Sequence, residues 1–161
     1  KESPKLVELT TDELCLQVDK TTGAVTYMTR DKKLLLAERS KESRQMYPSS
    51  IGPARSWLYL NWQKNENLYG ISAIENTNLS LKGTARYISH GADPQEFPFL
   101  LSDKGYGILM ASDGLTMCCD IPAYGSYLYT ECPDQMDYYF IAGRKSNTIL
   151  SAYGYLCGKS W

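Results

Sequence analysis

Residues 97–109 read Phe-Pro-Phe-Leu-Leu-Ser-Asp-Lys-Gly-Tyr-Gly-Ile-Leu, and this stretch decides the fold class. Two short apolar runs flank the polar residues 102–105, and Gly105 supplies the positive φ that a tight turn requires. Apolar runs of this length joined by such a turn predict an antiparallel β-hairpin.

The pattern of short strands and turns extends outward from this hairpin in both directions. Alternating or apolar runs, each bounded by polar residues or glycine, predict strands at 14–18, 25–27, 34–36, 57–62, 68–71, 115–121, 124–131 and 137–142. Residues 40–53 and 75–97 predict loops, because polar residues, glycine and proline interrupt any regular apolar period. Repeated strand-turn-strand units predict two packed antiparallel sheets.

One helix is predicted near the C-terminal end. Ser146 or Asn147 can cap a run in which apolar residues 149, 150, 153 and 156 fall on one face, and Gly158 stands at the C-cap position. The predicted fold class is therefore all-β, an antiparallel β-sandwich with one short C-terminal helix.

The composition bounds the function. A chain of 161 residues forms one domain. A net charge of −1, with lysine and arginine dispersed, argues against nucleic acid or an anionic membrane as partner. No apolar run approaches the roughly 18 residues of a membrane span, and residues 1–4 show no signal peptide.

The five cysteines are irregularly spaced in apolar stretches. This pattern predicts reduced core residues without basic neighbours, which favours the cytoplasm over an oxidising compartment.

Chemical motifs are scarce. His90 is the one histidine, so no site with several histidine ligands is possible. The sequence also lacks a glycine-rich phosphate loop and a nucleophile elbow. We therefore expect no cofactor, no metal and no catalysis by this chain alone.

Four segments carry a resemblance to a known family. Residues 68–70 (Leu-Tyr-Gly), 97–109, 137–143 (Asp-Tyr-Tyr-Phe-Ile-Ala-Gly) and 153–159 (Tyr-Gly-Tyr-Leu-Cys-Gly-Lys) follow one another as four motifs of glycoside hydrolase family 31 do. The chain resembles the N-terminal, galactose mutarotase-like β-sandwich domain of that family. One departure is that Ser72 and Ala73 replace the family's Gly-Glu pair after Tyr-Gly.

The resemblance implies that catalysis takes place in a different domain of the enzyme. Family 31 enzymes are mostly retaining α-glycosidases, such as α-glucosidases and α-xylosidases, whose catalytic aspartates lie on a (β/α)8 barrel. Residues 1–161 would then be a single domain that ends before that barrel and holds none of the catalytic residues.

The resemblance also implies a loop at the rim of the sugar site, at about residues 76–96. Within it we expect His90 and Asp93, and after them Arg86, to bond sugar hydroxyls. The competing interpretation is that Asp93 caps the turn at 91–94, while His90 and Arg86 lie on a solvated face. The implied partners are the chain's own barrel and an α-linked oligosaccharide.

Three alternatives stay open. A free-standing carbohydrate-binding module would gather several of the 13 tyrosines on one exposed face. A purely structural interdomain element would contact no ligand. An aldose mutarotase, which shares this type of sandwich, would have to use His90. A domain that expects a barrel should expose an apolar patch that includes residues of the terminal helix.

Overall fold

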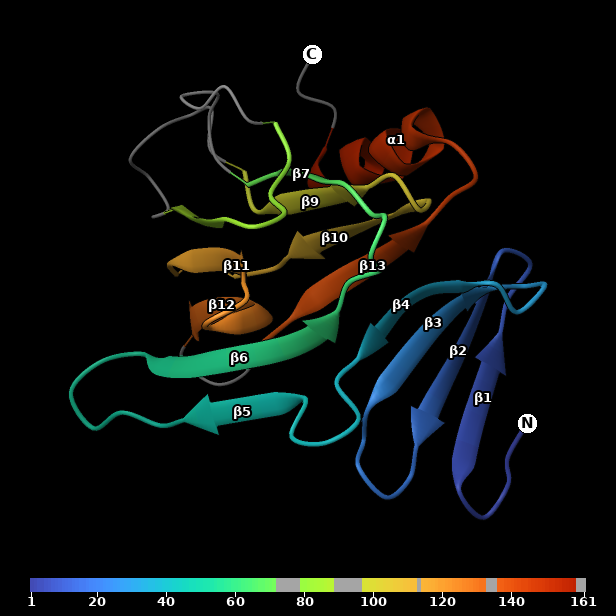
Figure 1. The fold of residues 1–161 in the computed structure, drawn as a ribbon, viewed down its shortest axis with the longest axis horizontal. Helices are drawn as coiled ribbons and strands as arrows, with labels where there is room; N and C mark the ends of the chain where they lie inside the picture. The colour runs from blue at the N-terminus through green and yellow to red at the C-terminus, as the bar shows by residue number, and fades with distance from the viewer. Residues whose placement is uncertain (72–78, 89–96, 113, 133–135, 159–161) are drawn as a thin grey trace.

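The computed structural model describes residues 1–71, 79–88, 97–112, 114–132 and 136–158. In this part of the chain two antiparallel sheets and one helix form a sandwich (Figure 1), which confirms the predicted fold class. The elements are β1 (Leu6–Thr10), β2 (Leu14–Asp19), β3 (Val25–Thr29), β4 (Leu34–Glu38), β5 (Arg44–Tyr47), β6 (Ala54–Asn61), β7 (Leu68–Gly70), β8 (Ala85–Ile88), β9 (Phe99–Ser102), β10 (Tyr106–Met110), β11 (Thr116–Ile121), β12 (Gly125–Cys132), β13 (Tyr138–Ala142) and α1 (Ser146–Cys157).

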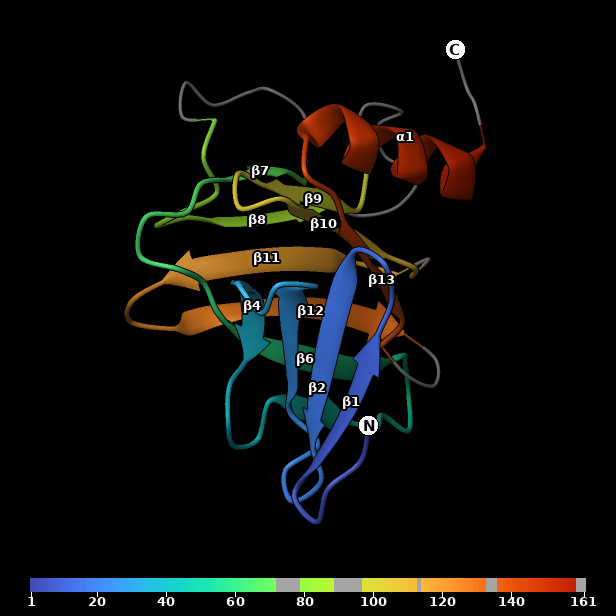
Figure 2. The ribbon, with the colours of Figure 1, turned by 90° about the vertical axis from the view of Figure 1, so that its right-hand side faces the viewer.

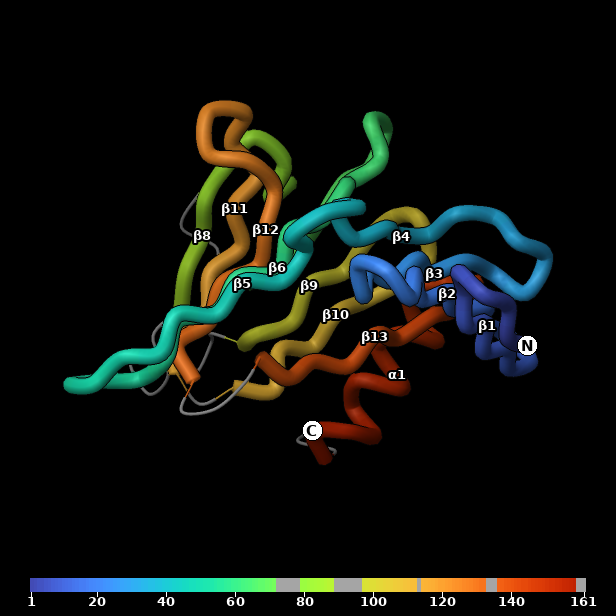
Figure 3. The backbone as a smooth tube through the Cα atoms, turned by 90° about the horizontal axis from the view of Figure 1, so that it is seen from below, coloured from blue at the N-terminus to red at the C-terminus, as the bar shows by residue number. Residues whose placement is uncertain are grey.

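The larger sheet has nine strands in the order β1-β2-β3-β4-β6-β12-β11-β8, with β5 paired to β6. Strand β4 joins β6 through only two residue pairs, Ala37 with Asn61 and Glu38 with Leu60. At this junction the sheet changes direction, and β1–β4 run steeply across the direction of β6, β11 and β12 (Figure 1). Seen from below, β1 and β8 lie at opposite sides of the molecule (Figure 3).

The smaller sheet has four strands in the order β13-β10-β9-β7 and lies between the larger sheet and α1 (Figure 2). Its inner side joins the main core with Leu100, Tyr106 and Ile108. Its outer side packs Phe99 and Leu109, with Ile141, against Ile149 of α1. Because both faces are covered, all five residues of β10 are buried.

Two glycines of the deciding stretch have separate roles. Gly105 adopts φ +92° in the β9–β10 turn, as the sequence predicts. Gly107 lies under the helix, where a Cβ atom would be 2.6 Å from the Phe99 ring and 2.9 Å from Ile149 Cγ2. The first glycine allows the turn, and the second allows α1 to approach the sheet.

Three strands differ from the sequence expectation. Strand β1 was not predicted, β5 lies within the predicted loop 40–53, and β8 lies within the predicted loop 75–97. These are short strands at sheet edges, and each buries few side chains. Their pairing comes from the neighbouring strand, so their own sequences carry little apolar alternation.

The helix is correctly predicted in existence but not in detail. Its N-cap is Lys145, without a side-chain cap, so the predicted cap at Ser146 or Asn147 is wrong. Gly158 occupies the C-cap as expected. The packed face consists of Ile149, with Ala152 and Tyr153 beside it. Leu150 and Leu156, predicted on that face, are 47% and 44% exposed, because the narrow contact with a sheet covers only one stripe of the helix.

Four of the five free cysteines are buried, as predicted, and Cys157 is exposed. Burial raises the pKa of the Cys118 thiol to about 12. The expectation that no basic group adjoins a thiol is wrong for Cys15, because the Lys32 ammonium donates to its sulfur at 3.0 Å. Lys32 lies 17 residues away in the chain, so only the fold reveals this contact. In the described part of the chain, no helix is both long and apolar enough to span a membrane.

Candidate functional site

Arg86 is the one predicted sugar-contacting residue that the structure describes. It lies in β8, an edge strand of the larger sheet, where it pairs in register with Cys118 of β11. It is half-buried and shares its face of the strand with the buried Ile88. His90 and Asp93 lie outside the described residues.

The turn before β8 is fastened to β11, although the sequence predicts a loop there. Asp120 of β11 pairs with Lys82 at 3.1 Å and accepts hydrogen bonds from Gly83 N and Ser126 Oγ at 3.0 and 2.6 Å. Burial raises the pKa of Asp120, but these hydrogen bonds outweigh it and leave the pKa below its usual value. Residues 81–88 are thus a fixed edge of the sheet, which limits any rim loop to the segments beside them.

A buried carboxylate, Glu66, organises the smaller sheet. It is 3% exposed. Its oxygens accept hydrogen bonds from Ser102 Oγ at 2.5 Å, from Gln63 N at 2.7 Å and from the Tyr106 hydroxyl. Burial, followed by the nearby carboxylate, raises the pKa of Tyr106 far above its ordinary value. Because it is buried and accepts from three donors, Glu66 is a structural anchor that joins the residues before β7 to β9 and β10.

A second buried carboxylate, Glu38, ties the two sheets together. Its side chain accepts from Arg44 Nη2 at 2.6 Å, from Val25 N at 3.2 Å and from the Tyr138 hydroxyl at 3.2 Å. The Tyr138 and Tyr27 hydroxyls lie 2.6 Å apart. Burial raises the pKa of both tyrosines. Both glutamates were missed by sequence reasoning, because nothing in the local sequence marks a carboxylate as buried.

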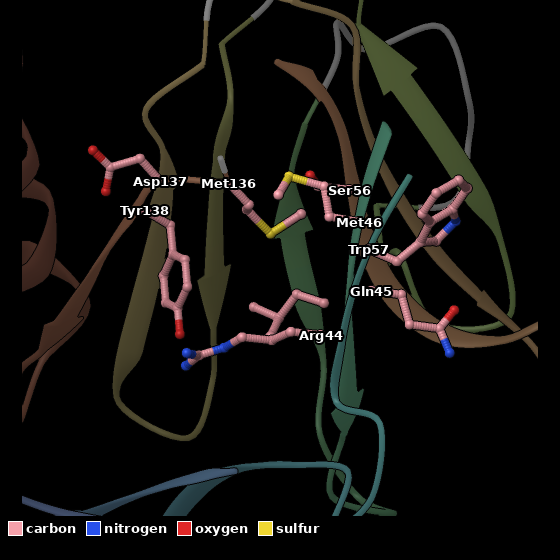
Figure 4. A pocket seen from close by; sticks show the side chains of 9 residues that line it. Arg44, Gln45, Met46, Ser56, Trp57, Met136, Asp137 and Tyr138 are labelled. Atoms are coloured by element: carbon pink, nitrogen blue, oxygen red, sulfur yellow. The ribbon is translucent and has the colours of Figure 1, made fainter. Parts of the chain in front are cut away.

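An open groove of about 300 Å³ lies between the β5–β6 ribbon and the start of β13 (Figure 4). In this view the sulfur-bearing chains of Met46 and Met136 meet across it, and the Arg44 guanidinium points toward Tyr138. Asp137, Gln45 and Trp57 point away from the centre. Because Arg44 is paired with Glu38 and Asp137 points away, the centre of the groove offers a mainly apolar surface.

A second groove, of about 510 Å³, separates the turns of the β1–β4 region from the β9–β10 turn. Six of its charged residues form three pairs: Arg30 with Asp12 at 3.0 Å, Lys104 with Asp103 at 3.3 Å and Arg144 with Glu13 at 3.4 Å. The remaining two, Asp31 and Lys33, are of opposite sign. Such compensated surface charge creates no preference for an ion of either sign. No cluster of three potential metal ligands occurs among the described residues.

No family model matches the sequence, and no curated protein matches it. Solved structures do match its fold. A cycloalternan-forming enzyme from Listeria monocytogenes, in complex with a pentasaccharide substrate, superposes with a TM-score of 0.88 at 18% identity, over 100% of this chain and 17% of that enzyme.

Two further solved structures carry the family name. A GH31 dextranase from Flavobacterium johnsoniae, complexed with glucose, has a TM-score of 0.76 and 23% identity over 96% of this chain and 20% of its own. A GH31 α-xylosidase from a soil metagenome, complexed with xylose, has a TM-score of 0.77 and 18% identity over 96% of this chain and 26% of its own. The resemblance to glycoside hydrolase family 31 is therefore confirmed for the fold, and this chain spans about a fifth of the length of these enzymes.

Proposed function

We propose that this chain is the non-catalytic N-terminal domain, of galactose mutarotase-like type, of a retaining family 31 α-glycosidase. It packs on a (β/α)8 barrel that carries both catalytic carboxylates, which retention requires about 5 Å apart. The observation that carries the proposal is the whole-chain match to a small part of three much larger enzymes. The substrate class is an α-linked glucoside or xyloside.

The outer face of α1 supports docking to a barrel. Leu150, Tyr155 and Leu156 are 47%, 85% and 44% exposed, although each is a large apolar or aromatic residue. Tyr139 and Phe97, on and beside the smaller sheet, are also partly exposed. The expected apolar residues on the terminal helix are therefore present, and we assign this patch to the barrel interface.

We place the sugar-contacting rim in the segment that continues from β8. Arg86 fixes the start of this segment at the sheet edge. His90 and Asp93 follow within seven residues, and their side chains would bond the hydroxyls of the sugar next to the scissile bond. The four buried free cysteines favour a reducing, cytoplasmic compartment for the parent enzyme.

Sequencing the gene beyond the codon for Trp161 tests the proposal. An open frame that encodes a barrel-sized region with two aspartates in family 31 motifs is the expected result. A stop codon directly after Trp161 would overturn the proposal and leave the second candidate, a free-standing carbohydrate-binding module. That candidate is favoured by one observation, the exposure of aromatic side chains on strands of the larger sheet: Tyr47 of β5 is 53% and Tyr87 of β8 is 65% exposed.

Variants of the full-length enzyme test the rim. His90→Ala and Asp93→Ala should raise KM for an α-glycoside about tenfold or more, because each removes a directional hydrogen bond to sugar. Tyr124→Ala is the control, since Tyr124 is 71% exposed in the β11–β12 turn, and the end of β8 at Ile88 pairs with the opposite end of β11. Unchanged kinetics in both rim variants would remove the rim from the proposed function.

A further inference from the structure

Aromatic side chains line up across the outer face of the larger sheet. Trp57 of β6 pairs in register with Tyr129 of β12, Tyr129 with Met117 of β11, and Met117 with Tyr87 of β8. Residues that are directly opposite in neighbouring strands project to the same side. These four side chains therefore form one continuous row across four strands.

A second row lies two residues away along the strands. Tyr59 of β6 and Tyr127 of β12 are in register, and their ring centroids are 5.5 Å apart. On β5, Tyr47 places its ring 5.4 Å from that of Trp57. Together Tyr47, Trp57, Tyr59, Tyr87, Tyr127 and Tyr129 make up what we call the aromatic face.

The aromatic face lies on the side of the sheet opposite to the main core. Within it, Tyr129 is buried at 8% exposure, and Trp57, Tyr59 and Tyr127 are half-buried. The residues that alternate with it, Leu58 and Leu128, are 1% and 0% exposed and belong to the main core. Figure 4 shows Trp57 and Gln45 pointing to the side opposite Met136 and Tyr138. Tyr47 and Tyr87, at the two ends of the face, are 53% and 65% exposed.

Charged side chains of both signs lie around this face, and Arg39 and Glu131 make contacts within the protein. The Arg39 guanidinium lies 3.9 Å from the centre of the Tyr59 ring and donates to the carbonyl oxygens of Lys41 and Glu42 at 2.9 and 2.8 Å. Glu131 accepts from the Tyr129 hydroxyl at 2.9 Å and lies opposite Arg55 in register. A site for an ion would present uncompensated charge of one sign, whereas this face matches a neutral ligand.

We propose that the aromatic face binds a neutral glucose oligosaccharide. The apolar faces of pyranose rings stack on the exposed Tyr47 and Tyr87 and on the half-buried Trp57. Such rigid rings supply apolar contact area at a low cost in conformational entropy. Arg55, Glu131 and Gln45 border the rings and supply donors and acceptors for hydroxyls. Tyr87 lies on the face of β8 opposite to Arg86, and the aromatic face needs no barrel.

Affinity electrophoresis of this chain through gels with and without dextran tests the proposal, with isothermal titration against maltoheptaose as the second measurement. We expect retardation by a ligand that binds with a dissociation constant on the order of 1 mM. Tyr87→Ala and Tyr47→Ala should each weaken binding about tenfold, because both rings are exposed and their loss leaves the core intact. Tyr155→Ala is the matched control, an 85% exposed tyrosine on α1, and should bind as the parent does.

Three outcomes would overturn the proposal. The chain migrates equally in both gels and shows no heat with maltoheptaose; or Tyr155→Ala weakens binding as much as Tyr87→Ala; or the anionic polymer polygalacturonate retards the chain more than dextran does. Failure of this test leaves the proposed role as the front domain of a glycosidase untouched, since that role depends on the downstream gene.

Discussion

The smaller sheet and the β1–β2 edge of the larger sheet differ in how many of their faces are covered. All five residues of β10 are buried, because α1 covers one face and the larger sheet covers the other. None of the residues of β1 is buried, and Leu9 is 60% exposed. Strands β1 and β10 are equally short, so the contribution of an apolar residue to stability depends on whether the faces of its sheet are covered.

The difference in coverage also decides where an unpaired polar group would lower the stability of the fold. In the smaller sheet, Ser102 and Tyr106 point inward and require the Glu66 carboxylate as a partner. In β1, the Glu8 side chain faces outward and meets Lys32 at 2.5 Å, with water available to replace it. Four predictions follow the contrast between a covered sheet and an open edge.

The largest expected effect on stability comes from truncating a buried side chain. Leu100→Ala in β9 should lower the unfolding free energy by about 2 to 5 kcal/mol, because Leu100 is 1% exposed and its loss leaves a cavity. The same change at the 60% exposed Leu9 should stay within about 0.5 kcal/mol. Urea denaturation followed by circular dichroism measures both. Equal losses would show that β1 is as much part of the core as β9.

The next effect concerns the Tyr106 hydroxyl. Tyr106→Phe should cost about 1.5 to 3 kcal/mol at neutral pH, since it takes a donor from the buried Glu66 carboxylate. Tyr139→Phe, on the neighbouring strand β13 and 48% exposed, is the control and should change little.

The raised pKa of Tyr106 should also make the stability of the chain depend on pH. Because the folded pKa of Tyr106 is raised, its contribution is complete below the ordinary tyrosine pKa of 10 and declines as the pH rises above it. The slope is about 1.4 kcal/mol per pH unit for each such tyrosine. Tyr106→Phe should make the loss of stability between pH 10 and 11 correspondingly shallower, and an unchanged slope would contradict the assignment.

The order of these effects explains what the sequence could predict. The hairpin at residues 97–109 could be predicted from the sequence. Its two strands are covered on both faces, and their residues are therefore almost all apolar. Strand β8 reads Ala-Arg-Tyr-Ile, with only Ile88 buried, so its sequence resembles that of a loop. Edge strands take their structure from a neighbour, and one sequence does not reveal that neighbour.

The candidate site was harder to predict from the sequence than the fold, for a related reason. Glu66 and Tyr106 are 40 positions apart, and the Trp57–Tyr129 pair spans 72. Such contacts follow from strand order, and strand order came from the resemblance and not from the alternation. Arg86 lies in strand β8, which the sequence did not predict, and its contact with sugar stays a prediction. The roles of His90 and Asp93 stay predictions.

The third effect tests the approach of the helix. Gly107→Ala should destabilise the chain by about 1 to 3 kcal/mol, because the new methyl group would lie 2.6 Å from the Phe99 ring and 2.9 Å from Ile149. Gly154→Ala, on α1, meets no atom within 4 Å and should instead stabilise by about 0.5 to 1 kcal/mol. Thermal unfolding compares the two. Stabilisation by both changes would mean that α1 does not pack closely against Gly107 of the smaller sheet.

The smallest effect is expected at the open edge. Glu8 accepts hydrogen bonds from Lys32 at 2.5 Å and from Gln17 at 2.9 Å, and the Lys32 bond is the main reason that the pKa of Glu8 is lowered to about 2. Lys32→Met should return that pKa toward its ordinary 4.5, as carboxyl carbon chemical shifts in an NMR titration would measure.

Because the folded pKa of Glu8 is lowered, its contribution is present above the unfolded value and is lost as the pH falls toward 2. The effect on stability should be slight, since water competes for both partners at the surface. Lys33→Met is the matched control, an adjacent lysine turned to the second groove, and it should leave the Glu8 titration in place. If both variants shifted the Glu8 titration equally, the general positive field of the turn, and not the Lys32 contact, would set the pKa of Glu8.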